Sequence, residues 1–546
     1  MKLISILVGV SALAAGVHFD GNATSYYPTT LGSLNLLEAS AKDVSDALAS
    51  GKVTSGALVK AYLARIEAHN HKGREGAVGL HLNAIIESAP FENVYAIATA
   101  LDAERAAGIV RSPLHGVPII IKDNYDTDVE LGMNTTAGSF ILYHAAGDVV
   151  GDAFVVKRLR DAGAIILAKS SLMVWSGISG VDASAWSPRG GQVSSPYVRG
   201  GFAAGGDPGG SSSGSGAGVS AGFAPLALGS DTEGSIVGPS GRGALFGLRP
   251  STGMTSRTGV VPISSSVDTT GPMGKSAWDV AVSLDIMAAF DRDDPYTGPA
   301  QESRPENYTQ FLQPDGFSGL RVGIIRDPFF RNETTREIAI VEAFDKALTQ
   351  FSSLGATVLE TPLPHPEQWN YTFVGAAQRA NNGTILIQYD VKADLAAYLR
   401  TRRRNSTIES LEDIINAGAR YFAEEYPEDK CCFPTFVAAD QVGDRGTSGE
   451  YWLAKQTQER LHEEGPAVLF EKYNLDVIAI PTDFDASRMG AVCRLPVGTA
   501  PLGYDDIGLP FGIAFIGKRY DEGSVIRAMS AYEAHFPPRQ VPSLLK

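Results

Sequence analysis

The sequence predicts an α/β domain in which helices surround a central β-sheet. Short apolar runs typical of buried strands alternate with amphipathic helical stretches along most of the chain. With 44% apolar and 20% charged residues over 546 positions, the composition is that of an ordinary globular protein. There is no internal repeat and no clean linker, and we interpret the Pro- and Gly-rich stretch 291–317 as an excursion within one domain. Such alternation is typical of helical layers packed on a sheet.

The N-terminus is interpreted as a secretory signal peptide over residues 1–16. Lys2 precedes an uncharged apolar run that ends in the small residues Ala12-Leu13-Ala14-Ala15-Gly16. The run is shorter than the roughly 20 residues that span a bilayer, and no later stretch is long and apolar enough to do so. A disordered or core N-terminus is the alternative. Residues 17–33 are polar and aperiodic and are expected to form a surface arm, so we place the folded domain at 34–540.

The first elements follow from caps and periodicity. Ser40 with Asp43 three residues later predicts a helix start with a capping-box variant. A second helix is expected over 55–68, and a third ends near Ala107, where Gly108 stops it. The apolar run 117–121 then predicts a buried strand that ends at Lys122-Asp123-Asn124.

The remaining elements alternate in type. Helices are expected over 152–162, 214–223, 338–354 and 523–534. Strands are expected over 164–168, 225–229, 322–325, 356–359, 475–480 and 511–516.

The charge excludes two function classes. The formal net charge is −15 and the pI is about 5.1, so the surface repels phosphate backbones and anionic lipid, which argues against nucleic-acid and membrane-surface binding. None of the nine His residues pairs with another His in a Cys- or acid-rich cluster, which argues against a structural zinc site.

Glycosylation acceptors and cysteines fit a secreted protein. The motif Asn-X-Ser/Thr occurs seven times, more often than chance would give, at Asn22, Asn134, Asn307, Asn332, Asn370, Asn382 and Asn405. Chance occurrence in a cytosolic protein is the alternative. Three cysteines allow one bridge and one thiol, and we favour Cys493 with Cys431 or Cys432 because a bridge between adjacent residues would be strained. Three unpaired thiols is the other arrangement.

The Gly/Ser-rich segment 205–216 admits several interpretations. A flexible linker is disfavoured because the segment continues directly into an α/β unit, and no Gly-x4-Gly-Lys-Ser/Thr phosphate loop is present. The run 210–214 fits a Gly-x-Ser-x-Gly nucleophile elbow, which would make Ser212 the nucleophile of an α/β-hydrolase. An α/β-hydrolase requires a histidine after the nucleophile in the sequence, and three follow: His365, His462 and His535. However, no strand precedes Ser211.

Ser235 and Lys122 suggest a different chemistry. Ser235 follows the strand 225–229 in a Gly-containing loop, whose backbone N–H groups can converge on a developing oxyanion. A serine hydroxyl needs a base to attack, and Lys122 lies at the end of a buried strand. Burial lowers the pKa of a lysine, so Lys122 can be neutral and accept a proton.

The sequence around these residues resembles that of the amidase signature enzymes. The segment 113–124, Pro-Leu-His-Gly-Val-Pro-Ile-Ile-Ile-Lys-Asp-Asn, is similar to their lysine segment, and 207–274 to their Gly/Ser signature, including Gly247-Leu248-Arg249-Pro250-Ser251-Thr252-Gly253. Further similarity lies at 259–262 and at Leu509-Pro510-Phe511-Gly512-Ile513, and the resemblance extends over about residues 34–535. It implies a mixed central sheet covered by helices on both sides.

The resemblance also implies site residues. Its nucleophile corresponds to Ser235, its bridging serine, which follows a cis peptide bond, to Ser211, and its base to Lys122. The backbone of Thr232, Glu233, Gly234 and Ser235 corresponds to the oxyanion loop, and Ser212 and Asp231 to supporting hydrogen-bonding positions. No metal or organic cofactor is implied. Two departures are Glu233, where many members carry Gly, and Val237, where some carry Arg; a carboxylate near an oxyanion is tolerable only if it points away.

The function expected on this basis is a secreted amidase that cleaves a small-molecule or peptide amide through an acyl-enzyme on Ser235. A catalytically silent secreted glycoprotein of the same fold is the alternative from another class. The amide-transferring subunit of a tRNA-dependent amidotransferase shares the signature but does not fit a secreted chain. The substrate and the oligomeric state are not predicted.

The substrate pocket is expected to be formed by the segments 130–145, 173–200 and 370–440. Tyr125, Phe140, Trp175 and Trp186 suggest an aromatic lining, although core packing is the more usual role of such residues. Because Lys122 must be neutral to act as a base, we expect Asp123 and Asp126 to point away from its amine; a buried ion pair with one of them is the alternative.

Overall fold

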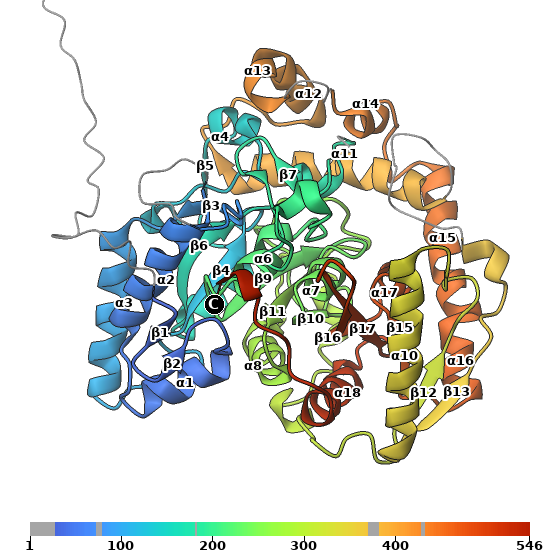
Figure 1. Cartoon of the computed structure of the whole chain (residues 1–546). Coiled ribbons are helices and arrows are strands. Elements are labelled where there is room, and N and C mark those ends of the chain that lie inside the picture. The colour runs from blue at the N-terminus through green and yellow to red at the C-terminus, as the bar shows by residue number, and fades with distance from the viewer. Residues whose placement is uncertain (1–27, 72–78, 181–182, 370–381, 427–431, 546) are drawn as a thin grey trace, which may run out of the picture.

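The computed structural model describes residues 28–71, 79–180, 183–369, 382–426 and 432–545 (Figure 1). The predicted signal peptide and most of the predicted arm lie outside these ranges. The described end of the arm contains β1 (Thr30–Leu31), which pairs antiparallel with β2 (Leu34–Asn35).

A mixed sheet of eleven strands runs through the molecule in the order β13-β12-β15-β17-β16-β10-β11-β9-β4-β6-β3. The pairs β12/β13, β12/β15, β4/β9 and β4/β6 are parallel, and the other neighbours are antiparallel. The strands are β3 (Ile85–Ser88), β4 (Pro118–Lys122), β6 (Ile165–Ser170), β9 (Leu226–Asp231), β10 (Phe246–Arg249), β11 (Thr269–Gly274), β12 (Arg321–Ile324), β13 (Thr357–Glu360), β15 (Val477–Pro481), β16 (Val497–Tyr504) and β17 (Pro510–Ile516).

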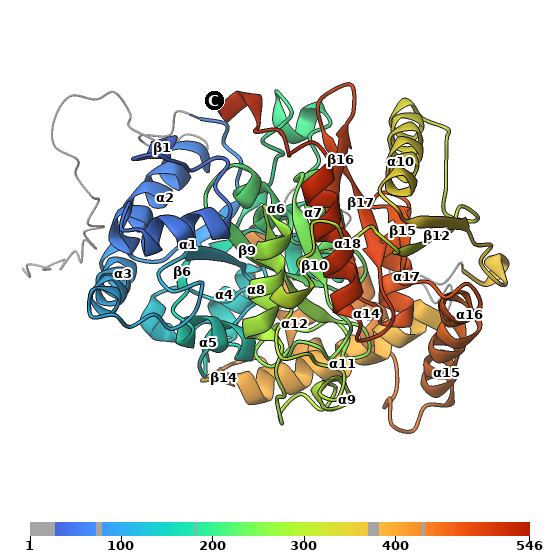
Figure 2. The ribbon, with the colours of Figure 1, turned by 90° about the horizontal axis from the view of Figure 1, so that it is seen from below.

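Helices cover both faces of this sheet, as the resemblance implies (Figure 2). On one face α8 and α18 pack against Phe246 and Gly498, and on the other α6 and α7 pack against Ile120 and Gly247. The helices of these two layers and of the N-terminal and C-terminal parts are α1 (Ala41–Ala49), α2 (Ser55–His69), α3 (Phe91–Ala106), α4 (Phe140–Ala145), α5 (Phe154–Asp161), α6 (Ser213–Ser220), α7 (Val237–Arg242), α8 (Ala277–Met287), α9 (Thr297–Ala300), α10 (Thr335–Ser353), α16 (Pro466–Lys472), α17 (Ala486–Cys493) and α18 (Glu522–His535).

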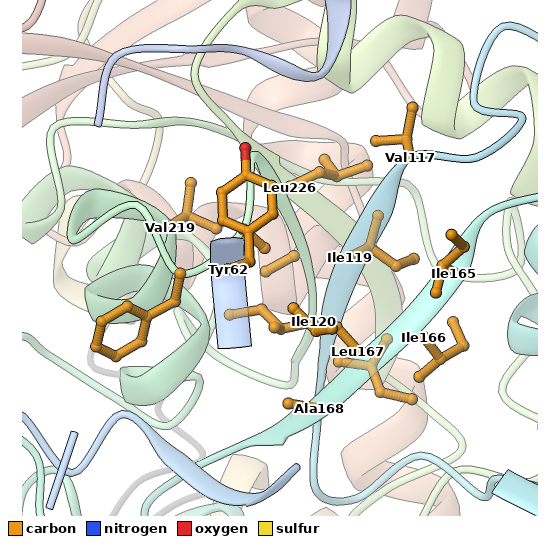
Figure 3. Close-up of a cluster of buried hydrophobic side chains, with 14 of the residues drawn as sticks. Tyr62, Val117, Ile119, Ile120, Ile165, Ile166, Leu167, Ala168, Val219 and Leu226 are labelled. Atoms are coloured by element: carbon orange, nitrogen blue, oxygen red, sulfur yellow. The ribbon is translucent and has the colours of Figure 1, made fainter. Parts of the chain in front are cut away.

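Strands β4 and β6 are among the most buried parts of the chain. Every residue of β4 and of β6 is buried, and Figure 3 shows Ile119 and Ile120 of β4 beside Ile166 and Leu167 of β6. Continuous apolar strands of this kind are expected where both faces of a parallel sheet are covered. A side chain at the end of β4 is therefore held in a rigid, water-poor environment.

A helical segment lies at one end of the molecule, at the top of Figure 1. Its described elements are α11 (Asn382–Arg402), α12 (Leu411–Arg420), α13 (Phe422–Glu425) and α14 (Pro434–Asp440). Helix α15 (Gly449–Glu464) follows at the right of the same view. Two short strand pairs accompany the main sheet, β5 (Asp148–Val149) with β14 (Arg403–Arg404) and β7 (Trp186–Ser187) with β8 (Gly191–Gln192).

Each helix and strand that the sequence predicts is present, with ends that differ by at most three residues. The capping box at Ser40 and Asp43 is confirmed, as is the stop at Gly108, whose φ is +81°. The stretch 291–317 packs against the rest of the domain through the buried side chains of Tyr308 and Phe317.

Four central or edge strands were not predicted: β3, β10, β11 and β16. Strand β11 contains Gly271 and Pro272, residues that usually argue against a strand. Gly271 is required here because a Cβ at that position would lie 2.0 Å from the carbonyl oxygen of Leu248 in β10.

The predicted disulfide is wrong. Cys493, at the end of α17, is a free cysteine whose thiol packs in the hydrophobic core with Met489 and Val492, where burial raises its pKa. Cys432 is disulfide-bonded, and Cys431 lies outside the described residues. None of the helices within the described ranges combines the length and the apolar character that crossing a bilayer requires.

Candidate active site

Lys122, Ser211 and Ser235 form a continuous hydrogen-bonded chain. The Nζ atom of Lys122 lies 2.8 Å from Ser211 Oγ, and Ser211 Oγ lies 2.9 Å from Ser235 Oγ. Lys122 is fully buried, whereas Ser235 is 8% exposed, so the chain runs from the interior toward the surface. The peptide bond between Gly210 and Ser211 is cis, as the resemblance implies. The three predicted residues are therefore brought together.

Neighbouring elements of the fold position these side chains. Lys122 is the last residue of β4, and β9 runs parallel to it and leads into the loop that carries Ser235. Ser211 directly precedes Ser212, the N-cap residue of α6, and its carbonyl oxygen accepts a hydrogen bond from the amide of Met173. The ends of two parallel strands and the start of a helix thus meet at one point, which is where α/β folds commonly carry their sites.

Burial lowers the pKa of Lys122 to about 7, although the carboxylates of Asp231 and Asp268 oppose this shift. The two acids nearest in sequence are directed elsewhere. Asp123 accepts hydrogen bonds from the hydroxyl of Thr136 and the amide of Gly138. Asp126 accepts them from Tyr398 at 2.6 Å and from Arg402 at 3.0 Å. Both expected orientations are confirmed, and neither acid forms an ion pair with Lys122.

Two residues beside Lys122 were not predicted as part of the site. Nζ of Lys122 lies 2.9 Å from the hydroxyl oxygen and 3.3 Å from the carbonyl oxygen of Ser230. The side-chain amide of Asn124 donates to the same hydroxyl at 2.9 Å. A signal was present in the sequence: Asn124 follows Lys122 by two positions, and Ser230 ends the strand 225–229 that precedes the Ser235 loop.

A buried ion pair organises the loop that leads to Ser235. Asp231 accepts hydrogen bonds from the amides of Gly234 at 2.8 Å and Ile236 at 2.7 Å. Arg249 of β10 donates to Asp231 Oδ1 at 2.7 Å, and both side chains are fully buried. Arg249 also donates to the carbonyl oxygens of Asp231 and Thr232. Asp231 therefore has the supporting position that was predicted, and Arg249 is a partner that was missed.

The side chain of Glu233 points to Arg488 of α17, 3.6 Å from the guanidinium Nε atom. The carboxylate at this position, where many related sequences carry glycine, is thus paired with a cation. Thr232 donates through its hydroxyl to Asp268 at 2.7 Å. The amide of Gly234 already donates to Asp231, which leaves the amides of Thr232, Glu233 and Ser235 as the ones to consider for an oxyanion.

The arrangement around Ser212 differs from a nucleophile elbow. Its hydroxyl donates to the carbonyl oxygen of Ser230 at 3.1 Å, and its amide donates to the carbonyl oxygen of Ser235. The segment before it is not a strand. Two of the candidate histidines face carboxylates elsewhere, His365 facing Glu367 and His535 facing Asp315. Ser212 therefore links the start of α6 to β9 and to the loop that carries Ser235.

A cavity of about 650 Å³ adjoins the hydrogen-bonded chain, a size that suits a small-molecule ligand. Lys122, Ser211 and Ser235 do not themselves line the cavity, which comes nearest to them at the neighbouring residues Asn124, Ser230 and Thr232. The largest part of its wall comes from the segment 257–270, which was not predicted to line a pocket. Ser176 and the stretch 394–402 come from two segments that were predicted to do so. No residue of 130–145 lines it.

The aromatic residues singled out in the sequence are chiefly structural. Tyr125 is fully buried, and its hydroxyl donates to the carbonyl oxygen of Gly229. Trp175 packs edge-on against Phe433 and Phe436 at centroid distances of 6.4 and 5.4 Å. Phe140 lies with His144 in a stacked pair, and Trp186 is half-buried in β7. None of the four lines the cavity.

Comparison with known proteins relates this fold and site to described ones. The family model named Amidase matches residues 57–492. The chain is 34% identical over 519 residues to a probable amidase from Arabidopsis thaliana, covering 94% of this chain and 93% of that protein. It is 30% identical over 522 residues to one subunit of the glutamyl-tRNA(Gln) amidotransferase from Moorella thermoacetica, covering 92% of this chain and 97% of that protein. Among solved structures, the peptide amidase from Stenotrophomonas maltophilia superposes with a TM-score of 0.82 at 33% identity, covering 93% of this chain and 99% of that one.

Proposed function

This chain belongs to the amidase family of hydrolases that act on amide C–N bonds, and we propose that it does so through an acyl-enzyme on Ser235. The observation that supports this proposal is the unbroken contact from Lys122 Nζ through Ser211 Oγ to Ser235 Oγ. A neutral base, a relay and a hydroxyl at the exposed end are the groups that acyl transfer to serine requires.

In the first half of the reaction, Ser235 Oγ attacks the amide carbonyl carbon. Its proton passes to Ser211 Oγ, while the proton of Ser211 passes to the amine of Lys122, which becomes an ammonium. The amides of Thr232, Glu233 and Ser235 hold the resulting oxyanion, and the pairing of Glu233 with Arg488 keeps that carboxylate away from it. The C–N bond then breaks as Lys122 returns a proton through Ser211 to the leaving nitrogen.

In the second half, a water molecule attacks the ester carbonyl of the acyl-enzyme. Its proton follows the same relay to Lys122. Collapse of the tetrahedral intermediate returns that proton to Ser235 Oγ, which releases the carboxylic acid and restores the free enzyme. The pKa of about 7 supports both roles of Lys122, because a base and an acid in one cycle work best when the pKa lies near the working pH.

A carboxamide of peptide size is the first substrate class that we propose to test. The similarity to a peptide amidase and the cavity of about 650 Å³ support this choice. The test is ammonia release from a panel of C-terminal peptide amides, aryl amides and fatty amides by wild type and by Ser235→Ala. Release by the wild type alone supports the proposal. No release from any amide, without labelling of Ser235 by a fluorophosphonate, would favour the catalytically silent alternative.

We also propose that the protein is secreted and N-glycosylated. The basic, apolar and small-residue pattern of residues 1–16 supports secretion, and that segment lies outside the described residues. Of the four acceptors whose side chains the structure describes, Asn134, Asn332 and Asn405 are exposed, while Asn307 is half-buried. The side-chain amide of Asn134 is engaged by Glu87 at 3.0 Å.

A further inference from the structure

The amine of Lys122 has three oxygen neighbours, and two of them belong to one residue. They are the hydroxyl of Ser211 at 2.8 Å, the hydroxyl of Ser230 at 2.9 Å and the carbonyl oxygen of Ser230 at 3.3 Å. An ammonium has three N–H donors and satisfies all three oxygens. A neutral amine has two N–H donors and one lone pair, so deprotonation raises the question of which neighbour the lone pair faces.

The position of Ser230 answers that question. A carbonyl oxygen can only accept, so one N–H must stay directed at the backbone of Ser230. If the Ser230 hydroxyl accepts the second N–H, the remaining tetrahedral direction of Nζ points at Ser211. The lone pair then faces the hydroxyl whose proton it has to remove.

The Ser230 hydroxyl is itself held in place. Nδ2 of Asn124 donates to it at 2.9 Å, and Asn124 is only 2% exposed, in the turn that follows β4. Ser230 lines the cavity, so its own proton has room to point away from the lysine. A contact of this kind fixes the rotamer of a serine that would otherwise turn freely.

We propose that Ser230, held by Asn124, is a positioning residue for the base: its hydroxyl and carbonyl oxygens accept the two N–H groups of neutral Lys122 and aim the lone pair at Ser211. This inference rests on the proposed function of the same site. It assigns roles to Ser230 and Asn124, which lie outside the three-residue relay of Lys122, Ser211 and Ser235.

The hydrogen bond from Lys122 to the Ser230 hydroxyl should also affect the pKa of Lys122. The Ser230 hydroxyl also accepts an N–H of the ammonium form, and a hydrogen bond to the charged form favours that form. Removing the hydroxyl should therefore lower the pKa of Lys122 while also slowing the reaction. A simple loss of packing would slow the reaction without moving the pKa.

The experiment measures the second-order rate constant for labelling by a small fluorophosphonate between pH 5 and 9. This probe reports the nucleophilicity of Ser235 without requiring the natural amide. The proteins are wild type, Ser230→Ala, Ser230→Thr, Asn124→Ala and the double variant Ser230→Ala/Asn124→Ala. Ser283→Ala is the matched control, because Ser283 is a fully buried serine of α8 whose hydroxyl donates to the carbonyl oxygen of Asp279 at 2.7 Å. A thermal melt of each variant verifies folding.

For Ser230→Ala we expect a labelling rate about tenfold or more below wild type on the pH plateau, since one positioning hydrogen bond is lost. Its acid limb should move to lower pH by about one unit. Ser230→Thr should restore both, because threonine keeps the hydroxyl. The double variant should be no slower than Ser230→Ala, because Asn124 acts only through Ser230.

The outcomes separate the two proposals. If wild type is not labelled at all, the proposed function fails. If wild type is labelled at Ser235 and Ser230→Ala is folded with an unchanged rate, or is slower with an unmoved acid limb, the positioning role is overturned. Additive losses in the double variant would overturn the part assigned to Asn124. If Ser230→Ala does not fold, Ser230→Thr with the wild-type profile and Asn124→Ala with a lowered acid limb still support the proposal, and an unmoved limb in Asn124→Ala contradicts it.

Discussion

Arg249 and Asp231 form an ion pair of 2.7 Å in which both side chains are fully buried, and this pair holds the loop that leads to the nucleophile. Oδ1 of Asp231 accepts hydrogen bonds from the amide of Gly234 and from the Arg249 guanidinium, and Oδ2 accepts one from the amide of Ile236. The geometry of the loop 231–236 therefore depends on a charge from β10, a strand that is distant in sequence.

Removing the cation should be costly. Arg249→Met leaves the carboxylate of Asp231 buried without its counter-charge, and loss of one partner of a buried pair typically destabilises by about 3–5 kcal/mol. Chemical denaturation measures this change. The control is Lys157→Gln, which breaks the exposed pair of Lys157 with Asp161 and should change stability by less than about 1 kcal/mol. A similarly small effect of both substitutions would contradict the assigned role of Arg249.

The two neighbouring serines should differ in importance. Ser235→Ala should abolish amide hydrolysis, because the covalent bond forms on Ser235. Ser212→Ala should retain measurable turnover, since its hydroxyl only donates to the carbonyl oxygen of Ser230. Steady-state kinetics compare the two variants. His535→Ala should leave the rate unchanged, and a strict need for His535 together with Ser212 would favour the α/β-hydrolase mechanism.

The rate should depend on pH through Lys122. The pKa of Lys122 is lowered to about 7 by burial, so kcat/KM should rise through an acid limb near pH 7 and level off on the alkaline side. Lys122→Ala should lose most of the activity. Lys122→Arg should not restore it, because a guanidinium stays protonated. A wild-type limb that persists in Lys122→Ala would show that another group is the base.

The free energy of unfolding should also depend on pH through Lys122. The folded pKa of Lys122 is about 7 and the ordinary value is 10.5, so between these limits the unfolded chain binds a proton that the folded chain lacks. The free energy of unfolding therefore rises with pH over this window, and the destabilising contribution is fully present below pH 7. The substitution Lys122→Met removes this destabilising contribution.

The measurement is the difference in unfolding free energy between wild type and Lys122→Met at pH 7, 8, 9 and 10. This difference should grow in favour of wild type as the pH rises, with a slope of at most about 1.4 kcal/mol per pH unit. Taking the difference cancels the other titrating groups. A flat difference would contradict the lowered pKa.

Glycan placement should depend on whether the acceptor amide is free and the rest of its sequon is accessible. We expect glycans on Asn332 and Asn405 and none on Asn134, whose side-chain amide donates to Glu87 and whose sequon residue Thr135 is buried. Glycopeptide mapping of the secreted protein reads each position. Occupied Asn134 with bare Asn332 and Asn405 would contradict this assignment.

Much of the site could be predicted because its parts are local sequence features. A buried apolar strand that ends in Lys122 and a Gly-containing loop after a strand each have a recognisable pattern. The contacts that orient these parts join residues that are not neighbours in the sequence. Arg249 and Asp231 are 18 positions apart, and Asn124 and Ser230 are 106 apart, so only the pairing of strands brings them together.

In the fold, too, local sequence features could be predicted, whereas features that depend on contacts between distant segments could not. Strands rich in branched apolar residues, such as β4, were predictable from their composition. Strand β11 was not, since its glycine and proline are accepted only because β10 approaches closely and the strand is enclosed on both faces. The pairing of Cys493 failed for a related reason: a cysteine count limits the number of bridges, while packing decides which thiols stay in the core.

The proposed mechanism depends on a covalent bond between Ser235 and the acyl group. The most direct test is to treat the purified protein with a fluorophosphonate at pH 8 and to locate the adduct by peptide mapping with mass spectrometry. We expect one adduct per chain, on Ser235, that is absent in Ser235→Ala and strongly reduced in Lys122→Ala. An adduct on Ser212, or labelling of Ser235 at an undiminished rate without Lys122, would contradict it.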